Sequence, residues 1–505
     1  MSANWLIWLL AAPLVAALGA FAVRRPGVLP RRLVEGLHLA SVSVVLGLAL
    51  LVVAAVLREG PLLALDDWLY VDALAAIFVL IIGVIGFLAG VYSVGYLRHD
   101  LETGALDARR LSVYYGFFNL FLFTMLLVVT SNNIVMLWVA VEATTLGSAF
   151  LVGLYGQKSS LEAAWKYVII CTVGVAFGLY GTVLVYADAA NVLQHPERAS
   201  LWTEIVRGAA ALDPTIMKVA FVFVLVGFGT KAGLFPLHAW LPDAHSEAPS
   251  PVSALLSAVL LKCAVFVILR YVVIVTPAIG PAFPQTLFLV FGGLSLAAAA
   301  FFIFVQRDLK RLLAYSSVEN IGLIALGLGL GGPAGILAAL LHTMNHSLAK
   351  ALMFCASGNI LIKYGSRDLE AVRGLLRVAP VTGLLLLCGA LALGGAPPFN
   401  LFVSEFWTVV AGVRAGQTAL IVVCLLLLTV VLTAFVKLVG GALFGAAPNH
   451  VRRGDVGLLN LLPLAVLVVL MLGLGLHLPA PIAQLLDQAA GVVLSSQSGT
   501  GMAGR

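Results

Sequence analysis

Long apolar runs joined by short charged loops limit how this chain can fold. Of its 505 residues, 62% are hydrophobic and only 10% are charged, whereas soluble domains carry about 25% charged residues. A helix needs about 20 apolar residues to cross a bilayer, and about fourteen such runs fit. We therefore expect an all-α polytopic membrane protein with crossings near residues 3–23, 36–57, 71–96, 111–130, 133–155, 161–187, 215–237, 249–276, 284–305, 311–330, 334–362, 377–411, 416–445 and 456–477.

The Lys and Arg residues of the loops predict the orientation. Arg24, Arg25, Arg31 and Arg32 follow the first run, and most other loop cations lie between an odd-numbered run and the next even-numbered one. Such loops face the cytoplasm. Because no basic flank precedes the first run, it predicts an uncleaved anchor rather than a signal peptide. We expect both termini outside, on the periplasmic side of a bacterial or archaeal inner membrane.

Two runs are interrupted at corresponding places. The seventh contains Gly233-Leu234-Phe235-Pro236, and the twelfth, five runs later, contains Gly394-Gly395-Ala396-Pro397-Pro398. Paired broken helices are typical of inverted-repeat transporters. The pattern predicts an N-terminal three-helix segment (1–110), two inverted five-helix repeats (111–276 and 284–445), and a last helix with a tail (446–505). We expect the tail to be weakly amphipathic from Pro479 to Leu486 and its end, SSQSGTGMAGR (495–505), to be frayed, with no long lateral helix.

No cofactor site is indicated by the motifs. The five cysteines are scattered through apolar runs without a C-x-x-C pair, and neither a P-loop nor a dinucleotide-binding glycine pattern occurs. The sequence therefore predicts no cofactor and no metal. The net charge of +6 falls in short loops and does not indicate nucleic-acid binding.

Charged residues inside the first repeat indicate ion transport, because buried charges in membranes are costly and usually functional. Glu142 lies within the fifth run, and we expect Lys231 of the broken seventh run to be its partner. Lys262 follows in the eighth run. A purely structural Glu–Lys ion pair is the alternative interpretation.

The second repeat carries a similar set. His342, His346 and Lys350 recur at i, i+4 and i+8, which places them on one helical face. They are the side chain types that a proton relay needs. Alternatives are a pair of buried hydrogen-bonding histidines or half of a metal site, which no further ligand completes. Glu405 follows the break in the twelfth run, and we expect it to match Lys231 by pseudo-symmetry.

Other ionisable residues are secondary candidates. Lys166 and Lys437 could instead extend to the membrane surface. Asp308, Lys310 and Arg311 are expected to be interfacial anchors, with a cytoplasmic entry route as the alternative. His238, Asp243 and His245 are expected near the cytoplasmic turn.

Several segments resemble one family, the antiporter-like subunits of respiratory complex I, Mrp-type sodium/proton antiporters and membrane-bound hydrogenases. They are WVAVEATTLGSAFLVGLY (138–155), LPDAHSEAPSPVSALL (241–256), RDLKRLLAYSSVENIG (307–322), HTMNHSLAKALMF (342–354) and PPFNLFVSEF (397–406). The first segment and SLEAAWKYVIICTVG (160–174) are most similar to component F of hydrogenase-4 and formate hydrogenlyase, a relative of NADH-quinone oxidoreductase chain 4.

The resemblance implies fourteen helices with a hydrated chain of charges at mid-membrane. It implies that Glu142, Lys231, Lys262, the eleventh-run track and Glu405 carry protons. Glu405 is typical of chain 4-like members, and the expected lack of a lateral helix also argues against a chain 5-like subunit. Asn320 stands where many relatives have His, which leaves neighbouring Glu319 as a possible substitute.

We therefore predict a proton-translocating, non-redox subunit of an ion-pumping complex. The resemblance implies partners: other membrane subunits, a soluble redox or other coupling module, and the lipid bilayer. Whether the subunit counts as an enzyme stays open. Alternatives are an Mrp-type sodium/proton antiporter subunit, a membrane subunit for inorganic-carbon uptake, and a scaffold.

Overall fold

The computed structural model describes residues 2–23, 28–449 and 451–496. Their α-helices are α1 (Ser2–Ala22), α2 (Val28–Glu59), α3 (Ala73–Glu102), α4 (Ala108–Thr130), α5 (Ile134–Val152), α6 (Lys158–Val192), α7 (Trp202–Gly208), α8 (Pro214–Ala232), α9 (Trp240–Glu247), α10 (Ser250–Leu255), α11 (Leu261–Ile279), α12 (Ala282–Val305), α13 (Leu309–Leu330), α14 (Gly332–Tyr364), α15 (Leu375–Val378), α16 (Pro380–Leu393), α17 (Asn400–Arg414), α18 (Thr418–Leu443), α19 (Leu458–Leu476) and α20 (Ala480–Ser495). Shorter elements are the 3₁₀ turns η1 (Pro196–Arg198) and η2 (Ala209–Ala211), the π-helical turn η3 (Leu256–Leu260), and strands β1 (Leu62–Ala64) and β2 (Leu69–Val71).

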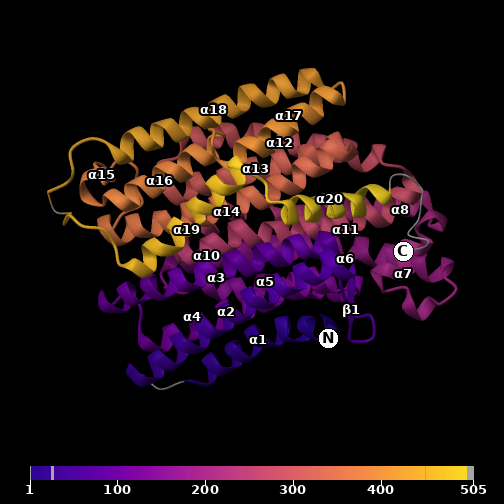
Figure 1. Cartoon of the computed structure of the whole chain (residues 1–505), viewed down its shortest axis with the longest axis horizontal. Coiled ribbons are helices and arrows are strands. Elements are labelled where there is room, and N and C mark those ends of the chain that lie inside the picture. Colours follow the sequence, from indigo (N-terminus) through magenta and orange to yellow (C-terminus); the bar gives the residue numbers. More distant parts are fainter. Residues whose placement is uncertain (1, 24–27, 450, 497–505) are drawn as a thin grey trace.

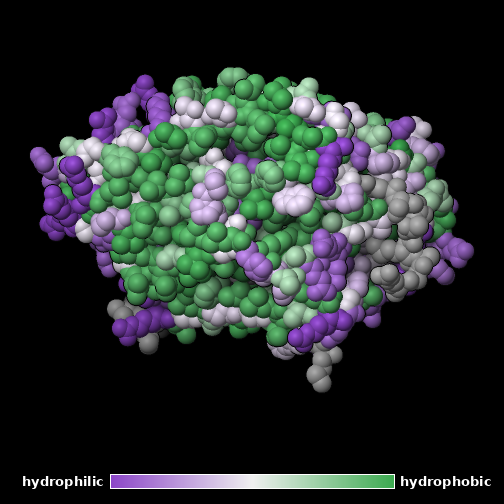
Figure 2. All heavy atoms as spheres, turned by 45° about the horizontal axis from the view of Figure 1, so that its top comes forward, coloured by the Kyte–Doolittle hydropathy of each residue, from purple (hydrophilic) through white to green (hydrophobic). Residues whose placement is uncertain are grey.

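The helices form a membrane-spanning bundle. Twelve segments of the described chain are long and apolar enough to cross a bilayer, which confirms the polytopic all-α fold. The long α14 and the broken pair α16 and α17 are not among the twelve, so the count of fourteen crossings stays a prediction. The helices run in broadly one direction, with α7 and β1 at one end and α15 at the other (Figure 1). Hydrophobic side chains cover most of the face in Figure 2, and hydrophilic ones gather toward its ends.

The most buried helices include those that carry interior lysines and histidines. The segment α10–η3–α11 is surrounded by protein along its whole length, and α13 is nearly so, whereas α18 and α19 are mostly exposed on their outer faces. The central α14 packs against α3, α13, α16, α17 and α19. The lysines and histidines of α11 and α14 therefore lie in the middle of the bundle, away from lipid.

Both expected helix breaks are present. Helix α8 ends at Gly233, whose φ of +84° is left-handed, and the chain resumes as α9. Helix α16 ends before Gly395, with φ of +67°, and the chain resumes as α17. Glycine adopts this backbone conformation without the steric cost that other residues meet. A third irregularity was not expected: the eighth run contains the π-helical turn η3, a feature that is frequent at functional sites.

Three peripheral segments refine the expectations. The connection 60–72 forms a β-hairpin in which Leu62 pairs with Val71. The long 188–214 connection contains a short helix, α7, that buries Trp202 and Ile205. The tail forms a longer ordered helix than the expected amphipathic stretch: α20 continues to Ser495 and buries Leu485, Leu486 and Ala489, where it packs against α3 and α14. Of the end expected to be frayed, residues 497–505 lie outside the described residues, as do Arg24 and Arg25.

Candidate functional site

Lys231 is fully buried at the last turn of α8. Its Nζ donates hydrogen bonds to Thr145 Oγ1 of α5 (2.7 Å) and to Tyr167 OH of α6 (2.8 Å). The negative end of the helix dipole favours a cation at this position, and the break leaves carbonyls there, one of which, that of Thr230, accepts from the Trp240 indole. The interrupted helix thus supplies a polar environment for one buried amine.

Glu142 does not form the expected ion pair with Lys231. Its carboxylate is half-buried on α5 and accepts a hydrogen bond from Thr172 of α6 (2.7 Å). Because Thr145 follows Glu142 by three residues, it lies on the same face of α5 one turn away. Its hydroxyl accepts from Lys231 and so stands between the two charges. The carboxylate itself is set toward the outer side of the bundle, where Thr172 is exposed.

Lys262 occupies the first turn after η3. Fully buried, it donates to the carbonyl of Ser257 within the π-helical turn (2.6 Å). The Ser257 hydroxyl is hydrogen-bonded to Ser317 of α13 (2.7 Å). The irregular turn therefore provides a lysine acceptor and a polar connection from α11 to α13.

The α14 residues share one face, as their spacing predicts. The rings of His342 and His346 are parallel, with centroids 6.2 Å apart. Lys350 donates to Leu313 O (2.8 Å) and Ser316 Oγ (2.6 Å) of α13. Neither ring nitrogen of buried His346 has a hydrogen-bond partner in the described part of the chain, and its electrostatic neighbours are Lys262, Lys350 and His342.

The partners of His342 can serve both of its protonation states. Its Nε2 lies 3.0 Å from Asn320 Oδ1, and its Nδ1 lies 2.9 Å from Ser404 Oγ of α17. When the ring is neutral, Nε2–H donates to Asn320 and the Ser404 hydroxyl donates to Nδ1. When the ring is protonated, Nδ1–H donates to Ser404, whose hydroxyl turns to Leu401 O, 3.0 Å away. Rotation of one hydroxyl thus accommodates gain or loss of a proton.

Two carboxylic acids accompany this cluster. Glu319 is buried on α13 and accepts a hydrogen bond from neighbouring Asn320. Glu405 lies on α17 with its carboxylate against Gly395, where any larger residue would clash. The expected match of Glu405 with Lys231 by pseudo-symmetry stays a prediction. Lys231 precedes the break in its helix, whereas Glu405 follows the break in its own.

The secondary candidates divide into surface and interior groups. Asp243 of α9 pairs with Lys166 (3.3 Å) and Arg311 (2.9 Å) at the surface, so Lys166 is held in an ion-pair network. Asp308 caps α13 and pairs with Arg367 (3.2 Å). Lys437 is exposed on α18, with its amine 5.4 Å from the Phe304 ring. These residues lie at the edge of the bundle rather than at its centre.

Three of the secondary candidates are buried. Lys310 was expected to be an interfacial anchor, but only 1% of it is exposed and its Nζ donates to Ala248 O (2.7 Å). His245, expected near the cytoplasmic turn, is fully buried and stacks on Phe354 with ring centroids 4.8 Å apart. Neither of its ring nitrogens has a hydrogen-bond partner among the described residues. His238 is also mostly buried, between the rings of Phe235, Phe302 and Tyr315.

Hydroxyl groups are what the sequence interpretation missed. Thr145, Tyr167, Ser316 and Ser404 each contact a buried lysine or histidine. Tyr167 directly follows Lys166, and successive helix positions point about 100° apart, so one residue faces outward while the next faces inward. The available signal was a Ser, Thr or Tyr residue on the helix face that the sequence pattern predicts to be buried.

The family follows from sequence comparison. Residues 131–433 match the model described as NADH:quinone oxidoreductase/Mrp antiporter, TM. The chain belongs to this family. Residues 63–104 also match the N-terminus of chain 5 of NADH-ubiquinone oxidoreductase (complex I), so the chain 4-like assignment drawn from Glu405 stays a prediction.

Curated relatives agree with the resemblance. The hydrogenase-4 component F homolog of Methylacidiphilum infernorum is 39% identical over 70% of this chain and 74% of its own length. NADH-quinone oxidoreductase subunit N of Desulforudis audaxviator is 32% identical over 77% and 75%. Hydrogenase-4 component B of Escherichia coli is 33% identical over 68% of this chain, which spans half of that relative.

Solved structures share the fold over nearly the full chain. A chain of the membrane-bound sulfane sulfur reductase, an archaeal respiratory membrane complex, superposes with a TM-score of 0.85 at 25% identity, covering 98% of both chains. A chain of respiratory complex I from Thermus thermophilus gives 0.73 at 25% identity, covering 93% and 97%. The Mrp complex of a Dietzia species gives 0.84 at 22% identity, covering 99% and 98%, which is a likeness of fold alone.

Proposed function

We propose that this chain moves protons across the membrane as a subunit of a redox-driven complex. The observation that carries the proposal is a set of five buried titratable residues in the middle of the bundle, joined mainly to neutral hydroxyls and carbonyls, together with the half-buried Glu405. We call these six residues the central polar line. It contains Lys231, Lys262, His346, Lys350, His342 and Glu405.

The contacts of the line suit proton exchange. A lysine held by hydroxyls and carbonyls can lose its proton without leaving a carboxylate unpaired. Burial also disfavours the charged form of a lysine, so a buried amine gives up its proton more easily than an exposed one. In this proposal, cytoplasmic protons load the line and leave near Glu405. Glu142, at the outer side of α5, couples the charge state of Lys231 electrostatically to the charge state of a neighbouring subunit. A change of charge on Glu142 would alter the affinity of Lys231 for its proton.

The energy would come from partner subunits. The sequence has no motif for an electron carrier, while its relatives are named as components of hydrogenase-4 and NADH-quinone oxidoreductase. We therefore propose that other membrane subunits and a soluble redox module assemble with this chain. Within it, residues 111–276 and 284–445 would be two inverted repeats, preceded by 1–110 and followed by 446–505.

The proposed sidedness follows the loop charges. The end of the bundle that carries α15 also carries the Arg-rich connections 98–110 and 306–311, which favours the cytoplasm. The other end, with α7 and β1, would face outside together with both termini, in the inner membrane of a bacterial or archaeal cell. Protein tags at the two termini that are digested only from the outside would support this sidedness.

The test replaces Lys231 with Ala in the assembled complex. Vesicles containing the complex should lose proton uptake driven by its electron donor, as followed with a pH-sensitive dye, while the subunits still copurify. The matched control is Lys166→Ala, which removes a half-exposed lysine on neighbouring α6. Normal proton uptake with Lys231→Ala would overturn the proposal.

The same vesicles separate the competing functions. Sodium/proton exchange driven by an imposed membrane potential, without any electron donor, would identify an antiporter component instead. That role is kept open by the 32% identity to a Na⁺/H⁺ antiporter chain of Alkalihalophilus pseudofirmus. A soluble zinc-containing partner in place of a redox module would point to inorganic-carbon uptake.

A further inference from the structure

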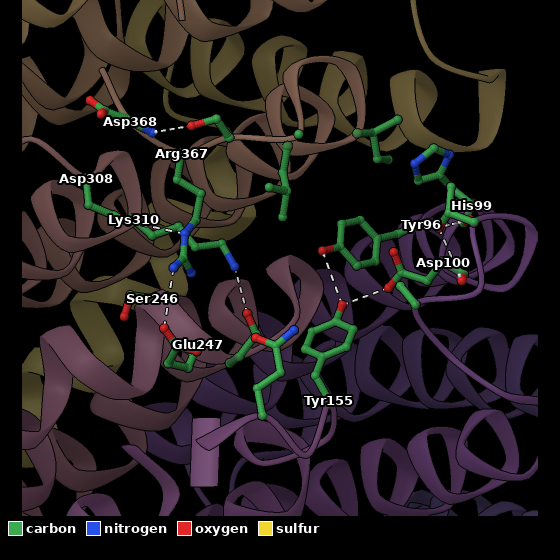
Figure 3. Close-up of a pocket in the computed structure, with 18 of the residues that line it drawn as sticks. Tyr96, His99, Asp100, Tyr155, Ser246, Glu247, Asp308, Lys310, Arg367 and Asp368 are labelled. Atoms are coloured by element: carbon green, nitrogen blue, oxygen red, sulfur yellow. Dashed lines mark hydrogen bonds and ion pairs between the residues drawn. The ribbon is translucent and has the colours of Figure 1, made fainter. Parts of the chain in front are cut away.

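A large cavity opens at the end of the bundle that carries α15. Its volume is about 790 Å³, enough for many water molecules. Its walls come from the end of α3, the α5–α6 connection, the end of α9, the start of α13 and the segment after α14 (Figure 3). None of the six residues of the central polar line is among its lining residues.

Lys310 lines this cavity from the start of α13. Its amine donates to Ala248 O and forms no ion pair with the described residues. Four charged groups act on it: Asp308 at the start of the same helix, Glu247 of α9, Asp100 of α3 and Arg367 after α14. Arg367 in turn contacts both Glu247 (3.4 Å) and Asp308 (3.2 Å), so those two carboxylates already have a cationic partner.

The opposite wall carries a second buried ionisable group. Asp100 is 8% exposed, and its Oδ2 accepts a hydrogen bond of 2.7 Å from Tyr155 OH. The same phenol lies 3.4 Å from Tyr96 OH. In Figure 3, Asp100 and Tyr155 point toward each other on one side of the cavity, and Lys310 lies on the other side. Water in the cavity would therefore have a carboxylate on one side and an amine on the other.

His245 directly precedes Ser246, which lines the cavity, and its ring stacks on Phe354 of the central helix α14. Neither ring nitrogen has a hydrogen-bond partner among the described residues, although the side chain is fully buried. Lys310, Lys350 and Lys262 all act on it electrostatically. A buried imidazole without partners is costly unless water or a mobile proton reaches it. On α13, Leu313 follows Lys310 by three residues, and its carbonyl accepts the hydrogen bond from Lys350.

We propose that this cavity is the entrance through which the translocated proton reaches the second repeat, with Lys310 as its first buried acceptor. The inference rests on the proposed function and specifies its cytoplasmic route. Neutral Lys310 takes a proton from cavity water onto Nζ. The resulting ammonium gives that proton to a ring nitrogen of neutral His245, which passes it to the neutral amine of Lys350. Lys231 has a separate role, which is to couple the central polar line electrostatically to Glu142.

Accessibility tests the entrance directly. Lys310→Cys should react with a positively charged, membrane-impermeant methanethiosulfonate in inside-out vesicles of the complex, and not in right-side-out vesicles. The chain with its five native cysteines gives the background, and Ser347→Cys is a matched buried control on α14. Labelling of Lys310→Cys no faster than that of Ser347→Cys, or labelling only from the outside, would overturn the proposal.

Substitutions at Lys310 separate a proton carrier from a structural cation. Lys310→Met and Lys310→Arg should both lower donor-driven proton uptake by about 10²-fold, because positioned proton carriers contribute 10²–10⁴ in rate and Arg does not release its proton. Lys310→His, which can titrate, should restore part of the rate. Full activity of the Arg variant would show a structural cation and overturn the inference.

Filling the cavity gives a test that leaves every charge in place. Ala105 is an exposed lining residue, so Ala105→Trp should reduce proton uptake, whereas Ala108→Trp, which is outside the lining, should not. Normal uptake with Lys231→Ala would refute the proposed function itself. Loss with Lys231→Ala, together with normal uptake in the Lys310 and Ala105 variants, would refute only this entrance.

Discussion

The ammonium of Lys231 donates a hydrogen bond of 2.8 Å to the phenol oxygen of Tyr167. That phenol is also hydrogen-bonded to Ser148 of α5, at 2.7 Å, and its ring packs on Trp240. A fully buried amine is therefore held by neutral groups from α5 and α6. On α6 the contact is made by Tyr167, not by Lys166, which directly precedes it in the sequence.

Tyr167→Phe tests the value of that contact. The change keeps the ring and its packing on Trp240 but removes one hydrogen bond to a charged group, worth about 1.5–3 kcal/mol. We expect donor-driven proton uptake to fall roughly 10- to 100-fold with little loss of thermal stability. Tyr180→Phe, at an exposed position of the same helix, is the control. Equal uptake in the two variants would mean that the phenol plays no part in holding or moving the proton.

Ser404→Ala tests whether the rotating hydroxyl beside His342 is needed. Without it, Nδ1 of His342 has no partner in either protonation state, so the ring should favour one state and proton uptake should fall. Ser404→Thr keeps the hydroxyl and should retain most of the rate. The control is Ser347→Ala, because Ser347 bonds only to Thr343 O of its own helix. The readout is the pH profile of uptake, which a purely structural serine would leave unchanged in shape.

The sequence predicted the membrane fold and the two breaks because both depend on local rules. Bilayer thickness fixes the length of an apolar run, and glycine with proline interrupts a helix wherever it stands. The spacing of His342 and His346 likewise predicted that they share one face of α14, since helix geometry sets which residues lie above one another. These features needed no knowledge of neighbouring helices.

The partners of the charged residues could not be predicted in this way, because they depend on packing between distant segments. Opposite charge suggested Glu142 for Lys231, yet the packing of α5 and α6 brings two hydroxyls to the amine. Lys310 looked like an anchor because it follows a charged loop, but α9 and α14 cover the start of α13. The π-helical turn before Lys262 has no glycine signal, and Lys262 itself satisfies one of its carbonyls.

Glu142→Gln tests the carboxylate on the outer side of α5. The amide keeps a hydrogen bond to Thr172 and a similar volume, so assembly should survive, but it cannot change charge. We expect donor-driven proton uptake to fall at least about tenfold, because the link between Lys231 and the neighbouring subunit is lost. Glu162→Gln, at an exposed carboxylate paired with Lys166, should have no effect. Full uptake with Glu142→Gln would limit this residue to a structural role.

Asp72 and Arg270 should contribute to stability rather than transport. They form a bidentate ion pair (2.6 and 3.0 Å) with both side chains 2% exposed. Asp72 also caps α3, and Trp202 packs on the guanidinium at 4.2 Å. Breaking such a buried pair costs about 3–5 kcal/mol, whereas Asn caps a helix about as well as Asp does. In detergent, Asp72→Asn should therefore lower the melting temperature clearly more than Asp213→Asn, an exposed cap on α8.

The double variant Asp72→Asn with Arg270→Met should recover part of the loss, since no unpaired charge stays buried. Equal melting temperatures for the two cap variants would contradict a stabilising ion pair.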